Sequence, residues 1–203
     1  MALTLPTGLL RDRIAALRRV FEDQGIATFS RVDLSANSRM ELLRFLRRFR
    51  NIYDIVAVKC DNQAVASIAC RDKRVDLVFF NPRNPQVKFS HPLASLLRGT
   101  LEFNLISSFL GETRSEVFSR VAKEAAIARE HGSRVILSSG CTAPGMVRSP
   151  LQISAIGESI GLSKELSNQG ICETPLSIIE RNQERRSREY VEEGVKLVTA
   201  RRR

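Results

Sequence analysis

The amino-acid sequence predicts an α/β domain in which strands alternate with helices around a mainly parallel sheet. Residues 53–60, 74–80 and 134–140 are apolar runs typical of buried strands, and segments with helical spacing of apolar residues separate them. The connections are mostly short, as in repeated βα units. The pattern indicates five or six strands but does not distinguish a closed barrel from an open sheet.

Local signals define the elements in order along the chain. Residues 8–24 have helical periodicity up to Gly25, and residues 26–34 alternate as a strand does. Capping residues at 35–38 precede the next helix, Pro and Asn mark a loop at 81–86, and Gly132 ends the longest helix. The other expected helices are residues 40–50, 61–70, a helix beginning near His91 and Pro92, 112–132, 149–161 and 175–198, and the other expected strands are 53–60, 74–80, 100–106 and 134–140.

Length and composition indicate one domain. The 203 residues are 43% hydrophobic, which is enough to bury a substantial core. We expect a single domain over residues 1–186, with the end of the last helix and a basic tail over 187–203. No apolar stretch has the roughly 20 residues that a membrane span requires, and no secretory signal is evident, so a soluble cytoplasmic protein is expected.

The charge balance indicates a polyanionic partner. The chain has 32 Lys and Arg residues against 22 Asp and Glu residues, a formal net charge of +10 and a pI near 10.2. Of the 32 basic residues 26 are arginines, whose planar guanidinium binds phosphate bidentately and stacks on bases. Nucleic acid is therefore favoured over an anionic membrane, since the chain has no Trp and lacks a basic helix with aromatic anchors.

The residues that catalysis or metal binding would need are scarce. Cys60, Cys70, Cys141 and Cys172 form no CxxC pair, so buried free thiols in a reducing compartment are expected. The only two histidines, His91 and His131, stand at a predicted helix start and a predicted helix end, where capping or surface positions explain them. The turn 138–145 resembles a phosphate-binding loop, but no histidine near Cys141 in the sequence supports a nucleophile. We expect no catalytic residue and no metal ligand.

An ordered set of features resembles a known family. The stretch DIVAVKCDNQAVASIACRDKRVDLVFF contains Asn62 just after a strand and the pairs Arg71-Asp72 and Arg74-Val75-Asp76 ahead of the next strand. A strand around 101–105, a Ser-Ser-Gly turn at 138–140, a helix start at 148–150 and PLSIIERN at 175–182 follow in order. Over residues 26–186 the sequence resembles protein component 3 of archaeal ribonuclease P.

The resemblance implies a fold and a role. The fold is a TIM-barrel-like (β/α) domain akin to the polymerase and histidinol phosphatase group, without that group's metal-binding histidines. The family's first strand would precede residue 8, so a short or missing first strand is expected. In such a complex the catalytic RNA, which holds Mg²⁺, removes the 5′ leader of precursor tRNA. The protein supports that RNA with a smaller ferredoxin-like subunit and other protein components, and binds no cofactor itself.

Basic residues at turns and helix ends are the candidates for RNA contact. They are Arg71, Lys73 and Arg74 in one turn, Arg148 after the small-residue turn, Arg114, Lys123 and Arg181 on helices, and the helix face formed by Arg44, Arg47 and Arg48. Solvated turns with local ion pairs, or an ordinary helix surface, explain several of them equally well. Two further functions stay open: a metal-dependent phosphoesterase of the same fold, and a general RNA- or DNA-binding module.

Overall fold

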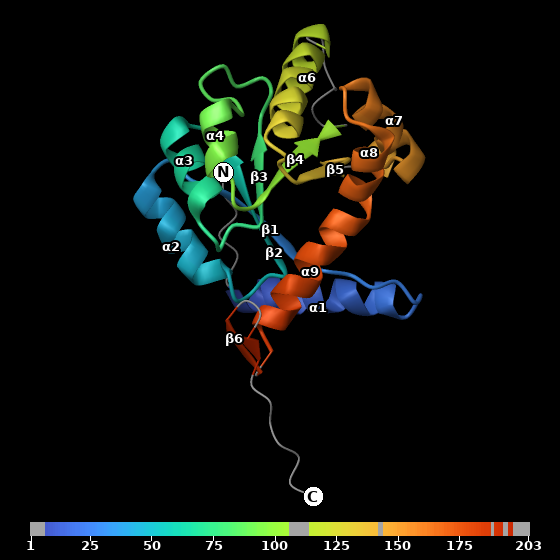
Figure 1. The fold of residues 1–203 in the computed structure, drawn as a ribbon. Helices are drawn as coiled ribbons and strands as arrows, with labels where there is room; N and C mark the ends of the chain where they lie inside the picture. The colour runs from blue at the N-terminus through green and yellow to red at the C-terminus, as the bar shows by residue number, and fades with distance from the viewer. Residues whose placement is uncertain (1–6, 106–113, 142–143, 188, 193–194, 197–203) are drawn as a thin grey trace, which may run out of the picture.

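The computed structural model describes residues 7–105, 114–141, 144–187, 189–192 and 195–196 (Figure 1). Strands and helices alternate through most of this range, as the sequence predicts. None of the helices in the described ranges is long and apolar enough to cross a lipid bilayer.

Five strands form one parallel sheet in the order β1-β2-β3-β4-β5. They are β1 (Arg31–Ser35), β2 (Ile55–Cys60), β3 (Leu77–Phe80), β4 (Thr100–Asn104) and β5 (Val135–Ser138). Each strand pairs only with its neighbours in this order, so the described strands form an open sheet with β1 and β5 at its edges. The parallel sheet of βα units is therefore confirmed, and the described strands do not close into a barrel.

Helices precede, connect and follow these strands. They are α1 (Thr7–Glu22), α2 (Arg39–Phe49), α3 (Gln63–Arg71), α4 (His91–Leu96), α6 (Arg114–Glu130), α7 (Pro150–Ser159), α8 (Lys164–Ile171) and α9 (Glu173–Arg185), with a 3₁₀ turn at Pro144–Met146. Four of them begin with a side-chain cap, in which Ser38 accepts from Glu41 N, Asn62 from Val65 N, Ser149 from Gln152 N and Ser163 from Leu166 N. The last of these begins α8, a helix that the sequence did not predict.

One face of the sheet carries the main core. Buried residues of the strands, such as Val58, Val78 and Leu101, pack there against the inner faces of α2, α3, α4, α6 and α7. On α2, Leu42 and Leu46 are fully buried, as the helical periodicity predicts. Of the candidate arginines, Arg44, Arg47 and Arg48 lie on α2 on this side of the sheet, whereas Arg181 lies on α9.

The opposite face is concave and is covered by α9 (Figure 1). Ile178 of α9 packs against Ala57, Leu77 and Ile136. Across the same face, Arg31 of β1 donates two hydrogen bonds of 2.6 Å to Glu102 of β4. Three strand spacings separate β1 from β4, about 14 Å along a flat sheet, so this contact indicates that the sheet curls, as in a TIM-barrel-like domain.

Three expectations need correction or fall outside the described residues. The helix expected over 175–198 ends at Arg185, and β6 (Tyr190–Glu192) and β7 (Val195–Lys196) form an antiparallel pair beyond it. The four cysteines are free, but only Cys60 and Cys70 are buried, whereas Cys141 and Cys172 are exposed. The expectation of a short or missing first strand concerns residues before 7, which lie outside the described ranges.

Candidate RNA-binding surface

Buried carboxylates at the amino ends of the strands bind several arginines. Asp76, just ahead of β3, has no exposed surface and accepts hydrogen bonds from Arg50 at 2.5 Å, Arg181 at 2.9 Å and the Val56 amide at 2.8 Å. Arg50 follows α2 and Arg181 lies on α9, so this single carboxylate joins both helices to the sheet. A buried carboxylate needs such partners because an unpaired charge there is costly.

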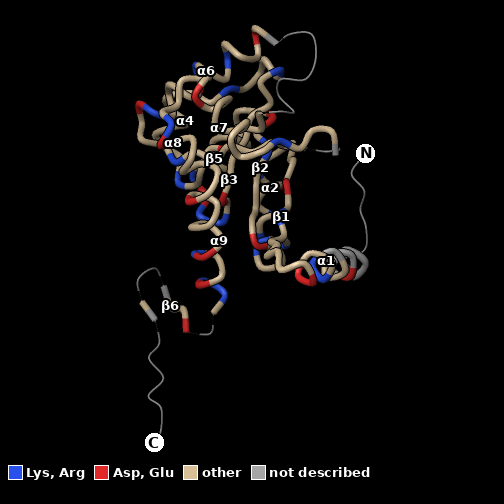
Figure 2. The backbone as a smooth tube through the Cα atoms, turned by 90° about the vertical axis from the view of Figure 1, so that its right-hand side faces the viewer, with Lys and Arg blue, Asp and Glu red and all other residues tan. Residues whose placement is uncertain are grey.

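Asp54, ahead of β2, forms a second centre of the same kind. Its side chain pairs with Arg18 of α1 and with Arg186 after α9, and it accepts hydrogen bonds from the amide and hydroxyl of Ser30. Burial alone would raise the pKa of Asp54, but the Ser30 hydrogen bonds and the two guanidinium groups outweigh it and lower the pKa. Figure 2 shows α1 and α9 on opposite sides of the lower end of β1 and β2, which this carboxylate joins.

Much of the arginine content therefore stabilises the fold. Five arginines have a carboxylate partner at these two centres or at Glu102, which is also buried; they are Arg18, Arg31, Arg50, Arg181 and Arg186. Partners 105 residues apart, as in Arg181 and Asp76, leave no local signal in a sequence. Arg181, a predicted RNA contact, is paired with Asp76, which it shares with Arg50.

The three basic residues in the turn between α3 and β3 differ in exposure and pairing. Arg71 and Lys73 are exposed. Arg74 instead forms a two-point pair with Asp72 through its Nε and Nη2 atoms, at 2.9 and 2.7 Å. The hydrogen bonds from Arg74 are the largest cause that lowers the pKa of Asp72. The turn therefore combines a local ion pair at Arg74 with exposed cations beside it.

The outer face of α2 carries the arginines that periodicity assigned to it. Arg44, Arg47 and Arg48 are all exposed, and the Arg48 guanidinium lies 5.1 Å from the ring centre of Phe49. Arg47 and Arg48 stand in the last turn of the helix, where positive side chains interact favourably with the helix dipole and stabilise the helix. This face thus combines a structural role with exposed positive charge.

The chain direction gathers basic helix ends at one edge of the sheet. In repeated βα units the helices run opposite to the strands, so their carboxyl ends meet at the amino ends of the strands. Arg47 and Arg48 end α2, and Arg71 ends α3. Arg98, an exposed residue after α4 that the sequence did not single out, adjoins them because its amide donates to the Cys70 carbonyl at 2.8 Å. We call Arg47, Arg48, Arg71, Lys73 and Arg98 the amino-edge patch.

The predicted contact at Arg148 lies elsewhere, before α7. Arg148 is exposed, and its Nη1 atom donates to the carbonyls of Gly145 and Val147 at 2.9 and 2.8 Å. Ser149 and Gln152 form a reciprocal capping box at the helix start. Two of the amides in this helix start, those of Gln152 and Ser149, already have partners within the chain, which weakens the case for phosphate binding there.

The last two candidates lie on α6. Lys123 is exposed, while the side chain of Arg114, at the start of the helix, lies outside what the structure describes. The amino-edge patch is built from α2, α3 and the turns after α3 and α4, so these two residues are not part of it.

The carboxyl edge of the concave face is where a phosphoesterase of this fold would hold metal ions. Ser138 there donates to Asn104 at 2.6 Å, and Lys59 pairs with Asp61 at 3.1 Å. Within the described ranges no histidine stands directly after any of these strands. His131 precedes β5 and Cys141 follows it, so the structure provides no histidine to activate that thiol among the described residues.

The fold and the exposed charges define a class: a curled parallel α/β domain with internal ion pairs and a basic edge suited to a polyanion. The chain belongs to the family described as RNase P subunit p30, whose model matches residues 8–187.

Curated relatives and a solved structure are similar to the chain. It is 24% identical over 178 residues to ribonuclease P protein component 3 of Haloarcula marismortui, covering 85% of this chain and 75% of the relative. For the protein of that name from Methanothermobacter thermautotrophicus the identity is 25% over 198 residues, covering 93% and 79%. A chain in a cryo-EM structure of archaeal ribonuclease P with mature tRNA matches with a TM-score of 0.82 at 18% identity, covering 95% of this chain and 85% of that one. At that identity the structural match supports the fold alone.

Proposed function

We propose that this chain is a protein subunit of ribonuclease P that binds and stabilises the catalytic RNA during removal of the 5′ leader from precursor tRNA. Family membership supports the assignment to ribonuclease P. The observation that carries the binding mode is the amino-edge patch, in which exposed cations from α2, α3 and the turns after α3 and α4 adjoin on a rigid scaffold.

The patch acts through phosphate contacts. Arginine and lysine on rigid turns neutralise backbone phosphates and release counterions, which gives affinity with little sequence preference. A folded RNA offers closely spaced phosphates from more than one strand, and a row of helix ends can contact several of them together. Arg44, on the same face of α2, extends the positive charge along that helix.

The cleavage chemistry belongs to the RNA in this proposal. The RNA holds the Mg²⁺ ions, and this chain holds the RNA in its active shape at a lower Mg²⁺ concentration. It does so in the cytoplasm, together with a smaller ferredoxin-like subunit and other protein components. No residue of this chain is assigned a catalytic role.

The experiment is RNA binding as a function of salt. The cognate catalytic RNA is titrated with wild-type chain, with the double variant R71Q/K73Q, and with R19Q/K164Q, which removes two exposed cations from α1 and α8. Removing one cation that neutralises a phosphate reduces the slope of log K against log salt by about 1. R71Q/K73Q should reduce the slope by about 2, while R19Q/K164Q leaves it within error of wild type.

If R71Q/K73Q and R19Q/K164Q give equal slopes of log K against log salt, the α3–β3 turn is not the RNA-binding surface. If wild-type chain binds an unstructured RNA of equal length as tightly as the catalytic RNA, a general RNA-binding module replaces the proposal.

A further inference from the structure

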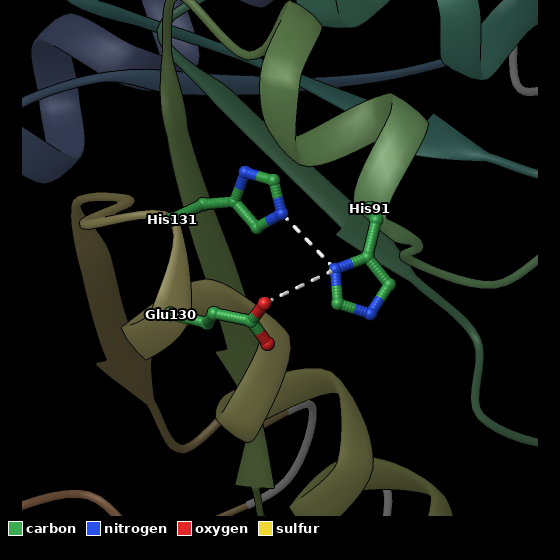
Figure 3. Close-up of side chains that lie close together, drawn as sticks. All are labelled: His91, Glu130 and His131. Carbon is green, nitrogen blue, oxygen red and sulfur yellow. Dashed lines mark hydrogen bonds and ion pairs between the residues drawn. The ribbon is translucent and has the colours of Figure 1, made fainter.

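Among the described residues, one group of metal-ligating side chains comes together outside the amino-edge patch. It consists of His91, Glu130 and His131, whose ligand atoms all lie within 4.8 Å of one another (Figure 3). His91 and His131 are the only two histidines in the 203 residues and stand 40 positions apart. Separately, each has the appearance of a surface residue at a helix end, but the fold brings both to one carboxylate.

We propose that His91, Glu130 and His131 form a binding site for a divalent transition-metal ion, with Zn²⁺ as the best fit. The site joins the start of α4 to the end of α6 and leaves a fourth position for water. It shares no residue with the amino-edge patch and does not depend on the proposed role in RNA binding.

The separations match the requirements of a zinc ion. Zn–N bonds are about 2.0 to 2.1 Å, so two imidazole ligands at a tetrahedral angle have nitrogens about 3.3 Å apart. His91 Nδ1 and His131 Nε2 are 3.1 Å apart. Glu130 Oε1 lies 3.9 Å from His91 Nδ1, a separation that a small rotation of this exposed side chain shortens. The three atoms thus need little movement to share one ion.

The ligand types select the class of metal. Two imidazole nitrogens and one carboxylate oxygen suit zinc and its neighbours copper and nickel, whereas magnesium and calcium prefer oxygen ligands throughout. Binding requires both histidines to be neutral, with the proton on the ring nitrogen that faces away from the ion.

The scaffold holds the two sides of the site in place. Arg120 of α6 donates to the carbonyls of Asn84 and Val87, and Glu124 of α6 accepts from the Phe89 amide at 3.2 Å. The same helix that ends in Glu130 therefore holds the segment that leads into His91.

The ends of the two helices are defined as well. The Ser90 carbonyl accepts from the Ala94 amide at 2.8 Å at the start of α4. Gly132 has φ of +60°, a conformation glycine adopts without strain, and this stops α6 just after His131.

The site is also accessible to an ion. The side chains of His91 and Glu130 are 56% and 68% exposed, so metal and water can enter without rearrangement of the core. The alternative is a pair of histidines that share a hydrogen bond without a metal, because a neutral imidazole can donate one proton to the other.

The test is metal binding by the full chain purified without a histidine tag. The exposed Cys141 and Cys172 can also bind zinc, so all proteins have the C141S/C172S background. Isothermal titration with ZnCl₂ gives stoichiometry and affinity, and imidazole NMR resonances report directly on the two histidines. Because the chain has two histidines, each resonance is assigned by its single variant.

We expect one Zn²⁺ per chain and a simultaneous shift of both imidazole resonances. H91N and H131N should each weaken binding by about tenfold or more, since loss of a residue that only supports a ligand already costs about 10- to 100-fold. E130Q should weaken it in the same direction, while E116Q, at an exposed position earlier in α6, leaves it unchanged. Far-UV circular dichroism controls for folding.

Two results overturn the site. If zinc leaves both imidazole resonances unmoved, the cluster is a hydrogen-bonded pair only. If zinc binds but H91N and H131N bind as tightly as wild type, the ion lies elsewhere.

Discussion

Replacing Asp76 by Asn should destabilise the domain more than any change at an exposed ion pair. The Asp76 side chain is fully buried, and it is the common partner of Arg50 and Arg181. The substitution keeps the shape and removes the charge, so two guanidinium groups lose their counterion. These side chains are only 15% and 27% exposed, so water compensates little for the missing charge.

The size of the effect follows from this burial. Removing one partner of a buried ion pair costs about 3 to 5 kcal/mol, and the partial exposure of the arginines places D76N near the lower end of that range. For a domain of this size a loss of about 3 kcal/mol lowers Tm by about 6 to 12 °C. D33N is the matched control, because Asp33 also pairs with an arginine but is 54% exposed, and exposed pairs contribute about 0 to 1 kcal/mol.

The assay is urea denaturation followed by circular dichroism, with the midpoint and the slope fitted separately. The double variant D76N/R181Q should lose less than the sum of its single variants, since the two groups interact directly. If D76N costs no more than D33N, or if D76N and R181Q are additive, the carboxylate does not hold α9 to the sheet.

Three further predictions follow from the same contacts. The pKa of Asp54 is lower in the folded protein than in the unfolded chain, so ionised Asp54 stabilises the fold above its usual pKa, and this stability is lost as the pH falls through the lowered pKa. The free energy of unfolding should therefore depend less on pH between about 5 and about 3 in D54N than in wild type. Cys141 and Cys172 should react with a thiol reagent in the native protein, whereas Cys70, whose pKa burial raises to about 12, should react only after unfolding. A Cβ atom added to Gly157 would lie 2.5 Å from a side-chain atom of Leu137 and 2.7 Å from the hydroxyl oxygen of Ser167. G157A should therefore lower the free energy of unfolding by about 1 to 3 kcal/mol, measured by thermal unfolding. An unchanged stability would show that α7 and α8 pack more loosely.

The spacing of apolar residues in the sequence correctly predicted which face of α2 is buried. The stripe of Leu42 and Leu46 on α2 and the arginines opposite it lie where a 3.6-residue repeat assigns them. The apolar runs likewise form the central strands of a parallel sheet. These features depend on residues close in sequence, which is why the sequence alone indicates them.

Partners distant in sequence could not be predicted in the same way. The sequence placed Arg181 on an expected helix but gave no sign of its pairing with Asp76, and the pairing of Arg31 with Glu102 depends on the curl of the sheet. Arg98 was missed because it stands alone in the sequence, and the fold brings it beside Cys70.

The error at the last helix has a physical cause too. Residues after 185 are rich in helix formers, but the last buried side chain of α9 is Asn182. Beyond it the helix has no sheet to cover, and helix propensity without packing gives marginal stability. The overestimate of the helix to residue 198 came from propensity alone.

The measurement that tests the central claim most directly is reconstituted cleavage of precursor tRNA. The cognate catalytic RNA and its other protein components are assayed over a Mg²⁺ series with wild-type chain, without the chain, and with R71Q/K73Q or R19Q/K164Q. Wild-type chain and R19Q/K164Q should support cleavage at low Mg²⁺, and omission of the chain or use of R71Q/K73Q should shift the requirement to higher Mg²⁺. An unchanged Mg²⁺ requirement without the chain, or metal-dependent phosphoester cleavage by the chain alone, would contradict the account.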